Sequence, residues 1–209
     1  MKRLVYGVGL NDEENQQVIG RVGGRVVRIS TDPLYTRWVG ILQRSYSDTW
    51  KKKYNSYEGC VVCDEWLVYS KFKQWFLDKS LGKDASGYDI DKDLLFPGVK
   101  IYSPLTCCLI PRYLNRCLVR RGSSDLFTGV IPRNNKFAAQ IFVGSKKVWL
   151  GTFNTKREAH QAWKNAKIKE MKRLQEEYKN DMLHDERVDI ALSRCIETLK
   201  SEEEVKWIV

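Results

Sequence analysis

The sequence predicts an α+β fold, and the strongest evidence lies in residues 128–154 and the helix that follows them. Two short breaks, at residues 134–136 and 143–147, divide this stretch into three runs in which apolar side chains alternate with polar or aromatic ones. Alternation with a period of two is typical of strands that bury one face, and such short breaks favour hairpins. We therefore predict a three-stranded antiparallel sheet.

A helix is predicted to begin after Thr155 and to cover one face of this sheet. Glu158 lies three residues after Thr155, which is the spacing of a capping box. Apolar residues then recur at helical spacing, and the small ones allow a helix to lie close against a sheet. These residues are Ala159, Ala162, Trp163 and Ala166.

The alternation assigns each strand residue to one of two faces. The face predicted to lie under the helix carries Val130, Phe137, Ala139, Ile141, Val148 and Leu150. The opposite face carries Ile131, Arg133, Lys136, Gln140, Phe142, Lys147 and Trp149. This second set combines cations, an amide and flat aromatic surface, which is the chemistry that contacts phosphates and base edges. The plainer alternative is that its aromatic side chains belong to a core or to a surface for a protein partner.

With these motifs, the segment from about residue 126 to 168 resembles an APETALA2-type DNA-binding domain, a module of plant ethylene-response factors that also occurs in phage and bacterial mobile proteins. The resemblance rests on TGV at 128–130, KFAAQI at 136–141, KVWLGTF at 147–153 and TKREAHQAW at 155–163. It implies that the sheet enters the major groove of double-stranded DNA. The residues implied to face the DNA are Arg133, Lys136, Gln140, Lys147 and Trp149.

Three departures from the plant pattern prevent the plant target sequence from being carried over. Plant domains have arginine at the positions of Ile131 and Phe142, and they have a longer turn where this chain has Asn135. The resemblance therefore implies a DNA-binding sheet without implying which bases it reads.

Charge is distributed unevenly along the 209 residues, whose net charge is +10. Residues 109–150 hold eight arginines or lysines against one acid, a net of +7, whereas residues 180–209 hold eight acids against four bases, a net of −4. A basic middle favours a polyanionic partner, and Arg120 and Arg121 are predicted to add to the DNA contact. A second group of cations is predicted to form a solvated helix face, with additional phosphate contacts as the alternative. This group consists of Lys164, Lys167, Lys169, Lys172 and Arg173.

Residues 1–121 are predicted to form a separate small domain of mixed elements. Helices are expected after Asp32-Pro33, over 70–79 and over 111–121. The polar, glycine-containing segment 120–125 is the best linker to a DNA-binding domain over 126–178. A helical acidic tail is expected over 179–209.

This first domain also resembles a known family, the phage HNH-type homing endonucleases, many of which carry an APETALA2-type domain after the nuclease-like one. The motifs occur in the same order, as VYGVG at 5–9, TRWVGILQRSY at 36–46, VCDEW at 62–66, DIDKD at 89–93 and IYSPLTCC at 101–108. The resemblance implies an HNH-like domain followed by a DNA-reading sheet.

The chemistry of such a nuclease is not preserved. HNH cleavage needs a histidine that activates water beside a divalent metal, but Asp91-Lys92 stands where an active member has Asp-His, and Thr106 stands where relatives have asparagine. The two histidines of the chain, His160 and His184, lie elsewhere. If the domain does cleave, Asp91, Lys92 and Asp93 are the candidate catalytic residues and Mg²⁺ the candidate cofactor.

Six cysteines raise the question of a metal or disulfides. Cys60 and Cys63 have C-x-x-C spacing, and Cys107 with Cys108 could complete a zinc site. Adjacent cysteines rarely ligate one ion, so the favoured interpretation is that Cys63 and Cys107 are small buried hydrophobic residues in contact with each other and that no metal is bound.

The acidic tail is predicted to contain a helix over 185–200 whose apolar stripe needs a cover. The stripe consists of Val188, Leu192, Cys195 and Leu199. Docking within the chain is the default, and self-association or a host protein are the alternatives.

No apolar run reaches the length of a membrane span, and the first residues lack the apolar core of a signal peptide. We therefore expect no membrane partner and a cytoplasmic protein, which for a phage protein means the cytoplasm of its host.

The function predicted from these patterns is a double-stranded DNA-binding protein of phage or mobile-element type whose nuclease-like domain is inactive. An active HNH-type endonuclease or nickase is one alternative. An inhibitor or decoy that binds a host protein is the other.

Overall fold

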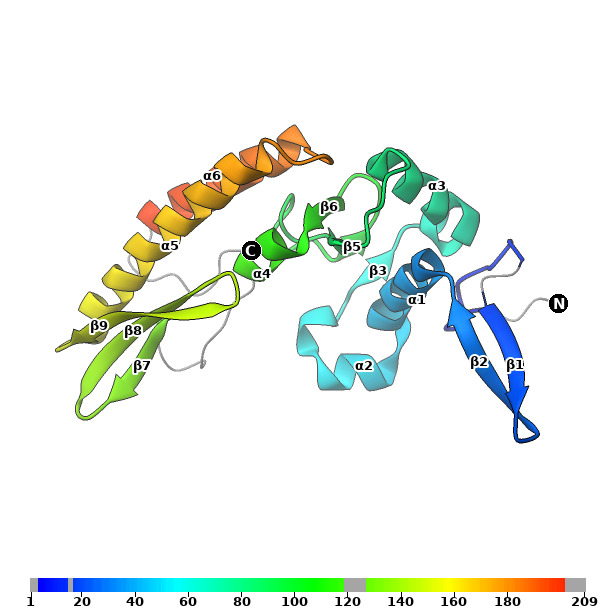
Figure 1. Cartoon of the computed structure of the whole chain (residues 1–209), viewed down its shortest axis with the longest axis horizontal. Coiled ribbons are helices and arrows are strands. Elements are labelled where there is room, and N and C mark those ends of the chain that lie inside the picture. Colours follow the sequence, from blue (N-terminus) through cyan, green and yellow to red (C-terminus); the bar gives the residue numbers. More distant parts are fainter. Residues whose placement is uncertain (1–3, 15–16, 119–126, 202–209) are drawn as a thin grey trace. The chain divides into compact units, whose positions relative to one another are not determined.

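The computed structural model describes residues 4–14, 17–118 and 127–201 and divides the chain into two compact units (Figure 1). Unit 1 comprises Met1–Ala85 and Gly98–Cys107, and unit 2 comprises Ser86–Pro97 and Cys108–Val209. The predicted boundary between 121 and 126 lies outside the described residues. Two segments predicted to belong to the first domain, 86–97 and 108–118, are part of unit 2 because they pair with each other and pack with its helices.

Unit 1 consists of helices and two small sheets. Its elements are β1 (Gln17–Val22), β2 (Arg25–Thr31), α1 (Pro33–Tyr46), α2 (Asp48–Lys53), the 3-10 turn η1 (Asn55–Tyr57), β3 (Val61–Val62), the 3-10 turn η2 (Asp64–Leu67), α3 (Tyr69–Ser80) and β5 (Ile101–Tyr102). β1 and β2 form an antiparallel hairpin, and β3 pairs in parallel with β5. The hairpin and α2 were not predicted from the sequence.

The two helices predicted in unit 1 are confirmed. Asp32 caps α1, since its Oδ1 accepts a hydrogen bond from the backbone N–H of Leu34 at 2.8 Å. The hydroxyl of Tyr69, at the start of α3, donates to Asp32 Oδ2 at 2.9 Å. Trp38 is fully buried and its Nε1 donates to the carbonyl of Trp66 at 2.7 Å. Asp32 thus has two roles, because it caps the start of α1 and also binds the hydroxyl of Tyr69, a residue of the core.

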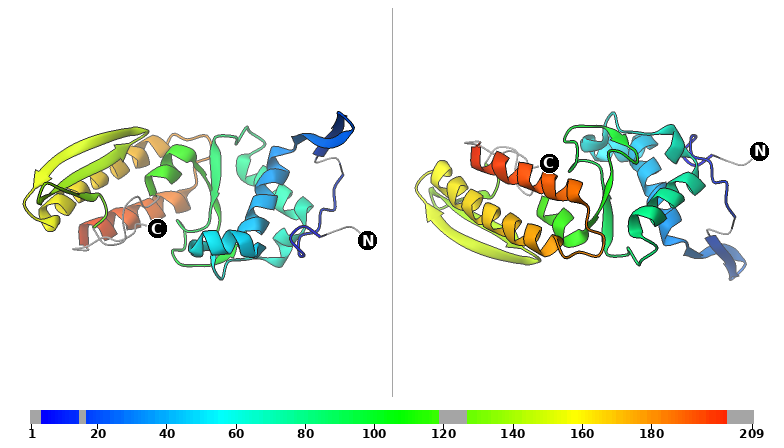
Figure 2. Two further views of the ribbon diagram at one scale, coloured as in Figure 1. Left: turned by 90° about the horizontal axis from the view of Figure 1, so that it is seen from below. Right: turned by 90° about the horizontal axis from the view of Figure 1, so that it is seen from above.

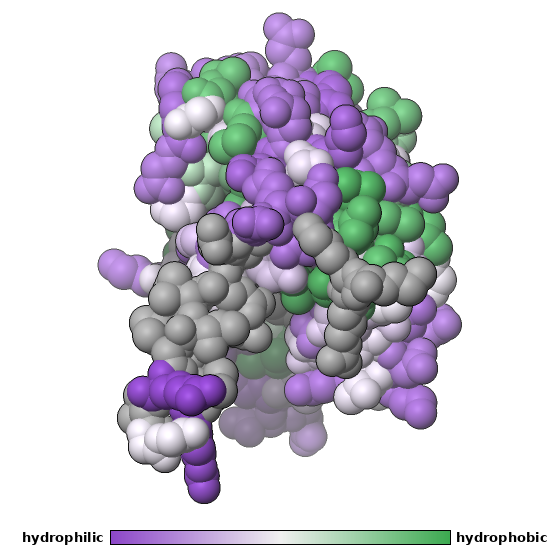
Figure 3. All heavy atoms as spheres, turned by 90° about the vertical axis from the view of Figure 1, so that its right-hand side faces the viewer, coloured by the Kyte–Doolittle hydropathy of each residue, from purple (hydrophilic) through white to green (hydrophobic). Residues whose placement is uncertain are grey.

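One face of the molecule, seen from the right-hand side of Figure 1, carries both hydrophilic and hydrophobic side chains (Figure 3). Among the atoms not drawn in grey, hydrophilic side chains predominate and hydrophobic ones form separate groups.

Unit 2 contains a hairpin, a three-stranded sheet and three helices. Its elements are β4 (Tyr88–Asp91), β6 (Cys108–Pro111), α4 (Arg112–Leu118), β7 (Val130–Arg133), β8 (Lys136–Val143), β9 (Lys146–Phe153), α5 (Lys156–Tyr178) and α6 (Glu186–Ser201). β4 and β6 are antiparallel, and the sheet has the order β7-β8-β9 with both pairs antiparallel. The predicted α+β fold and its three-stranded antiparallel sheet are confirmed. Helix α4 is described only to Leu118, so the rest of the helix predicted over 111–121 lies outside the described residues.

Helix α5 lies between the sheet and α6 (Figure 2). Its first turn contains the predicted capping box, in which Glu158 N–H donates to Thr155 Oγ1 at 3.2 Å and Thr155 N–H donates to Glu158 Oε2 at 3.3 Å. Its first half packs Ala159 and Trp163 against the sheet. Among the described helices, α5 packs on one face of the sheet, and the other face has no helix against it.

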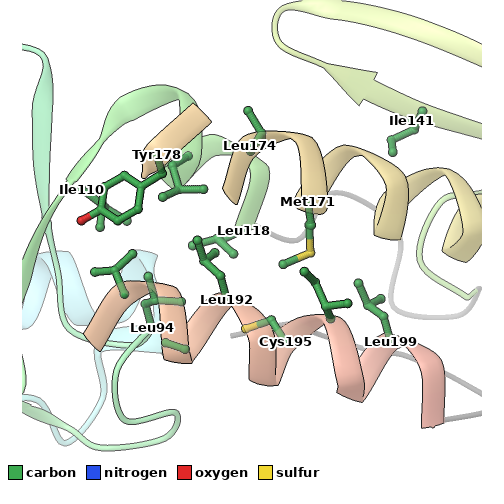
Figure 4. Close-up of a cluster of buried hydrophobic side chains, with 14 of the residues drawn as sticks. Leu94, Ile110, Leu118, Ile141, Met171, Leu174, Tyr178, Leu192, Cys195 and Leu199 are labelled. Atoms are coloured by element: carbon green, nitrogen blue, oxygen red, sulfur yellow. The ribbon is translucent and has the colours of Figure 1, made fainter. Parts of the chain in front are cut away.

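The second half of α5 packs on α6, and the apolar stripe of the tail helix is buried there. Side chains of α5 and α6 meet in one cluster (Figure 4), which includes Met171, Leu174, Tyr178, Leu192, Cys195 and Leu199. The guanidinium of Arg194 donates to the carbonyls of Leu94 and Leu95. The predicted docking within the chain is confirmed, and this stripe is not available for self-association or for a host protein.

None of the helices in the part of the chain that the structure describes is both long and apolar enough to span a membrane.

The turns of the sheet explain the two breaks in the sequence pattern. Asn134 and Asn135 have φ values of +47° and +59°, which is the backbone of a two-residue hairpin turn with both central residues left-handed. Gly144 has a φ of +60° in the second turn. Glycine and asparagine adopt this conformation at lower cost than other residues.

Replacing Gly129 with alanine is expected to destabilise unit 2 strongly. Gly129 precedes β7 with a φ of +81°, and a Cβ there would lie 2.0 Å from Cδ1 of Trp163, a buried ring that cannot move aside. Gly144→Ala is the matched control, because its φ is also positive but nothing lies within 4 Å of the added Cβ. Chemical denaturation should give a loss of about 1 to 3 kcal/mol for the control and a clearly larger loss for Gly129→Ala. Equal losses would contradict the packing of Trp163 on Gly129.

Candidate nucleic-acid interface

The strand register places the five predicted DNA-facing side chains on one face of the sheet. Arg133 pairs with Lys136 across β7 and β8, and Gln140 pairs with Trp149 across β8 and β9. Lys147 pairs with Phe142. Because residues two apart in a strand share a face and directly paired residues lie side by side, all five side chains project from the face opposite α5.

A bulge in β9 sets this arrangement. Ala139 pairs with Gly151, whereas the next residue, Gln140, pairs with Trp149, so Leu150 is an extra residue in β9. An extra residue reverses the alternation of the strand beyond it. Trp149 therefore points away from α5 while Leu150 packs against the core. Gly151, at the bulge, has a φ of +132°, a backbone that favours glycine.

Arg133 and Trp149 are stacked on the open face. The guanidinium carbon of Arg133 lies 4.7 Å from the centroid of the Trp149 ring, whose residue is 45 % exposed. The pair joins β7 to β9 across β8. Ala138, between them on β8, is fully buried although none of the described helices packs on this face, so neighbouring side chains shield it. Stacking of this kind holds a guanidinium in a fixed plane.

The charged side chains of the sheet are all positive. Between residues 130 and 153 there are four cations and no acid, and the cations are Arg133, Lys136, Lys146 and Lys147. No carboxylate forms an ion pair with any of the four in the described part of the chain. Cations that are not neutralised within the protein are available to an anionic ligand.

The cover of the sheet is less complete than the sequence predicted. Val148 is on the helix side by register, paired with Ile141, but it is 39 % exposed, and Val143 beside it is 37 % exposed. α5 does not cover the sheet next to the turn at 144–145, because its second half packs on α6 instead. The expectation that Val148 is buried was wrong.

Two lysines predicted to be solvated on α5 are buried instead. Lys164 and Lys167 are 4 % and 6 % exposed. Lys167 Nζ donates to the carbonyl of Cys117 and lies 3.2 Å from its Sγ, at the carboxyl end of α4. A cation at this end of a helix offsets the partial negative charge of the carbonyls. Lys167 therefore has a structural role. Two further predicted DNA contacts, Arg120 and Arg121, lie outside the described residues.

The acidic residues predicted as a possible nuclease site, in the run 89–93, form hydrogen bonds and an ion pair with neighbouring residues. Asp91 Oδ1 accepts hydrogen bonds from the N–H groups of Asp93 at 3.0 Å and Leu94 at 2.7 Å. Lys92 is buried and forms an ion pair with Asp93. Loss of hydration in this partly buried position raises the pKa of Asp91 above its ordinary value, and the two N–H donors only partly counter this.

The neighbouring Asp89 is also occupied, since its carboxylate accepts from Arg112 Nε at 3.3 Å and Asn115 Nδ2 at 3.0 Å. These contacts tie β4 to α4. In the part of the chain that the structure describes, no three histidine, cysteine, aspartate or glutamate side chains come together as metal ligands.

The same finding applies to the four cysteines considered for zinc. Cys60, Cys107 and Cys108 are buried, and burial raises the pKa of the Cys63 thiol. The geometry of the described residues therefore gives no support to a zinc site at these four positions. The two histidines are likewise structural: His160 is buried with its Nδ1 3.0 Å from the carbonyl of Thr128, and His184 Nε2 lies 2.6 Å from Asp189.

Comparison with known proteins gave no match to any family model, any curated protein or any solved structure.

One cluster of cations was missed by the sequence analysis. Lys51, Lys52 and Lys53 form the last turn of α2, a helix that was not predicted. The signal was visible as three consecutive lysines, but without the helix there was no surface on which to place them.

Two substitutions of Asp91 test whether its carboxylate acts through its accepting oxygen or through its charge. Its folded-state pKa is raised, so folding carries a penalty for the charged carboxylate that is absent below the unfolded pKa of about 3.9 and grows as the pH rises. Asp91→Asn keeps the accepting oxygen and removes the charge, so at pH 7 it should be at least as stable as the wild type, with the difference shrinking toward pH 4. Asp91→Ala should lose about 1 to 3 kcal/mol, because two N–H groups lose their acceptor. Thermal unfolding at both pH values provides the measurement. Destabilisation by both variants at pH 7 would mean that the charge itself is needed.

Proposed function

We propose that unit 2 binds double-stranded DNA and that the open face of the β7-β8-β9 sheet lies in the major groove. The observation that carries this proposal is that Arg133, Lys136, Gln140, Lys147 and Trp149 share the face of the sheet opposite α5, and that within the described ranges none of their cations pairs with a carboxylate. The major groove is about 12 Å wide and accepts a two-stranded ribbon or a helix. The helix of this sheet is on the other face, so the strands are the elements that can enter.

Each side chain of this face has a chemistry suited to one part of the duplex. An arginine bonds the O6 and N7 acceptors of guanine, and a glutamine amide bonds the N6 and N7 of adenine. Stacking on Trp149 holds the guanidinium of Arg133 in one plane before binding, which lowers the entropic cost of a two-bond contact. Lys136 and Lys147 are suited to phosphate oxygens. Ile131 and Phe142 are suited to apolar contact with thymine methyl groups.

The resemblance to APETALA2-type domains supports the same choice of face and groove, and it is the reason for proposing a protein of phage or mobile-element type. For the nuclease-like part we propose that cleavage has been lost. Asp91 holds backbone N–H groups and Lys92 is buried against Asp93, so the groups that remain are used to form a turn.

Arg133→Ala and Trp149→Ala should each weaken binding to a selected duplex by about 1 to 3 kcal/mol while leaving the thermal unfolding of unit 2 unchanged. Lys169→Ala is the control, since it removes an exposed cation of α5 that lies away from the open face. Selection of bound sites from random duplexes supplies the probe, and fluorescence anisotropy measures the affinity. Equal effects of all three variants would contradict the proposed interface.

The same purified samples separate the two alternatives. Incubation of the wild type with supercoiled plasmid and Mg²⁺ or Mn²⁺ should give no nicking above background, and nicking that Asp91→Ala abolishes would make the protein an endonuclease. If the wild type binds no duplex at all, the DNA-binding proposal fails, and a protein partner becomes the better account of the exposed Trp149.

A further inference from the structure

Unit 1 has its own group of cations, three lysines that are separate from the cations of the β7-β8-β9 sheet in unit 2. Lys51, Lys52 and Lys53 complete the last turn of α2, and Lys52 and Lys53 are exposed. No carboxylate pairs with any of the three among the described residues. We call these three residues the lysine patch.

A fourth cation and two aromatic rings adjoin the lysine patch. Lys100 Nζ donates to the carbonyl of Ser56 at 2.6 Å, which brings its charge to the 3-10 turn that follows α2. Trp50 and Tyr54 contact each other at 4.8 Å between ring centroids, and Lys53 Nζ lies 5.3 Å from the Tyr54 ring. The three lysines therefore lie on a short helix whose start is capped by Ser47 and whose end packs through the Trp50–Tyr54 contact.

Helix stability alone does not account for three adjacent lysines. One cation near the end of a helix contributes about 0.3 to 1 kcal/mol through the helix dipole, and neighbouring cations oppose one another. Some cations elsewhere in the described residues have acidic partners, as in Lys73 with Glu13 at 2.6 Å and Lys179 with Glu176 at 2.7 Å, whereas Lys71 and Lys79 of α3 form no ion pair. The lysine patch is distinguished by having three such cations adjacent in one helical turn.

We infer that the lysine patch is a second DNA contact, which holds backbone phosphates of the duplex that the sheet reads. This inference rests on the proposed function of the sheet. A lysine ammonium on a flexible stem acts as a point charge with no fixed geometry, so it suits phosphates and carries no sequence information. A duplex is favoured over other anions because unit 1 and unit 2 belong to one chain, so that binding by one unit raises the local concentration of the same duplex at the other.

The division of roles gives a distinctive expectation. The patch adds affinity for any duplex, whereas the sheet discriminates between sequences. Each phosphate neutralised contributes about 0.9 to the slope of log K against log salt. Removing two patch lysines should therefore flatten this slope by about 2. It should also lower the affinity for the selected duplex and for the random duplex by the same factor.

The experiment uses the full chain with Lys52→Ala/Lys53→Ala and a matched control, Lys71→Ala/Lys79→Ala, which removes two exposed lysines of α3 in the same unit. Anisotropy with a selected duplex and a random duplex is measured over a series of salt concentrations, and thermal unfolding confirms that both variants fold. The inference predicts a flatter slope for the patch variant only, with an unchanged ratio of the two affinities.

Three results would overturn the inference. Equal effects of the two variants would show that only net charge matters, and a changed affinity ratio would show that the lysines read bases. Patch-dependent binding of duplex RNA without any effect on duplex DNA would assign the patch to another partner. If Arg133→Ala weakens binding but the patch variant does not, the proposed function stands and this inference fails; if the wild type binds no duplex, both fail.

Discussion

The two-sided packing of helix α5 is the constraint on which unit 2 depends. Ala159 and Trp163 in its first half pack against the sheet, and Met171 in its second half is buried against α6. A three-stranded sheet with one helix is too small to be stable without further support, and α6 provides that support from the far side of α5. In the described part of the chain, no helix packs on the opposite face of the sheet.

The open face acquires its chemistry through two local features of the strands. The bulge at Leu150 and Gly151 turns Trp149 outward, and the turn at Asn134 and Asn135 brings β7 back along β8 so that Arg133 can reach the Trp149 ring. Without the bulge, Trp149 would face α5 and Arg133 would have no ring to stack on. A single extra residue thus separates the face that packs on α5 from the face that carries Trp149.

The parts of this structure that could be predicted from the sequence are those fixed by neighbours in the chain. The three strands follow from alternation, and the start of α5 follows from the spacing of Thr155 and Glu158. The parts that could not be predicted depend on distant contacts. The grouping of β4 and β6 with unit 2, the burial of Lys167 beside Cys117 and the exposure of Val148 each require knowledge of where α4, α5 and α6 lie. For the same reason the local role of Asp91 could not be read from an alternating acidic run.

The central claim is that the open face of the sheet, and not the helices, meets the duplex. An NMR titration of the full chain with a selected duplex tests it directly, with Trp149→Phe used to assign one indole N–H signal. The account predicts that the indole signal of Trp149 and the amide signals around Arg133, Gln140 and Lys147 shift most, while those of α6 around Leu192 stay in place. Shifts confined to α6, or no change at the Trp149 indole at saturation, would contradict it.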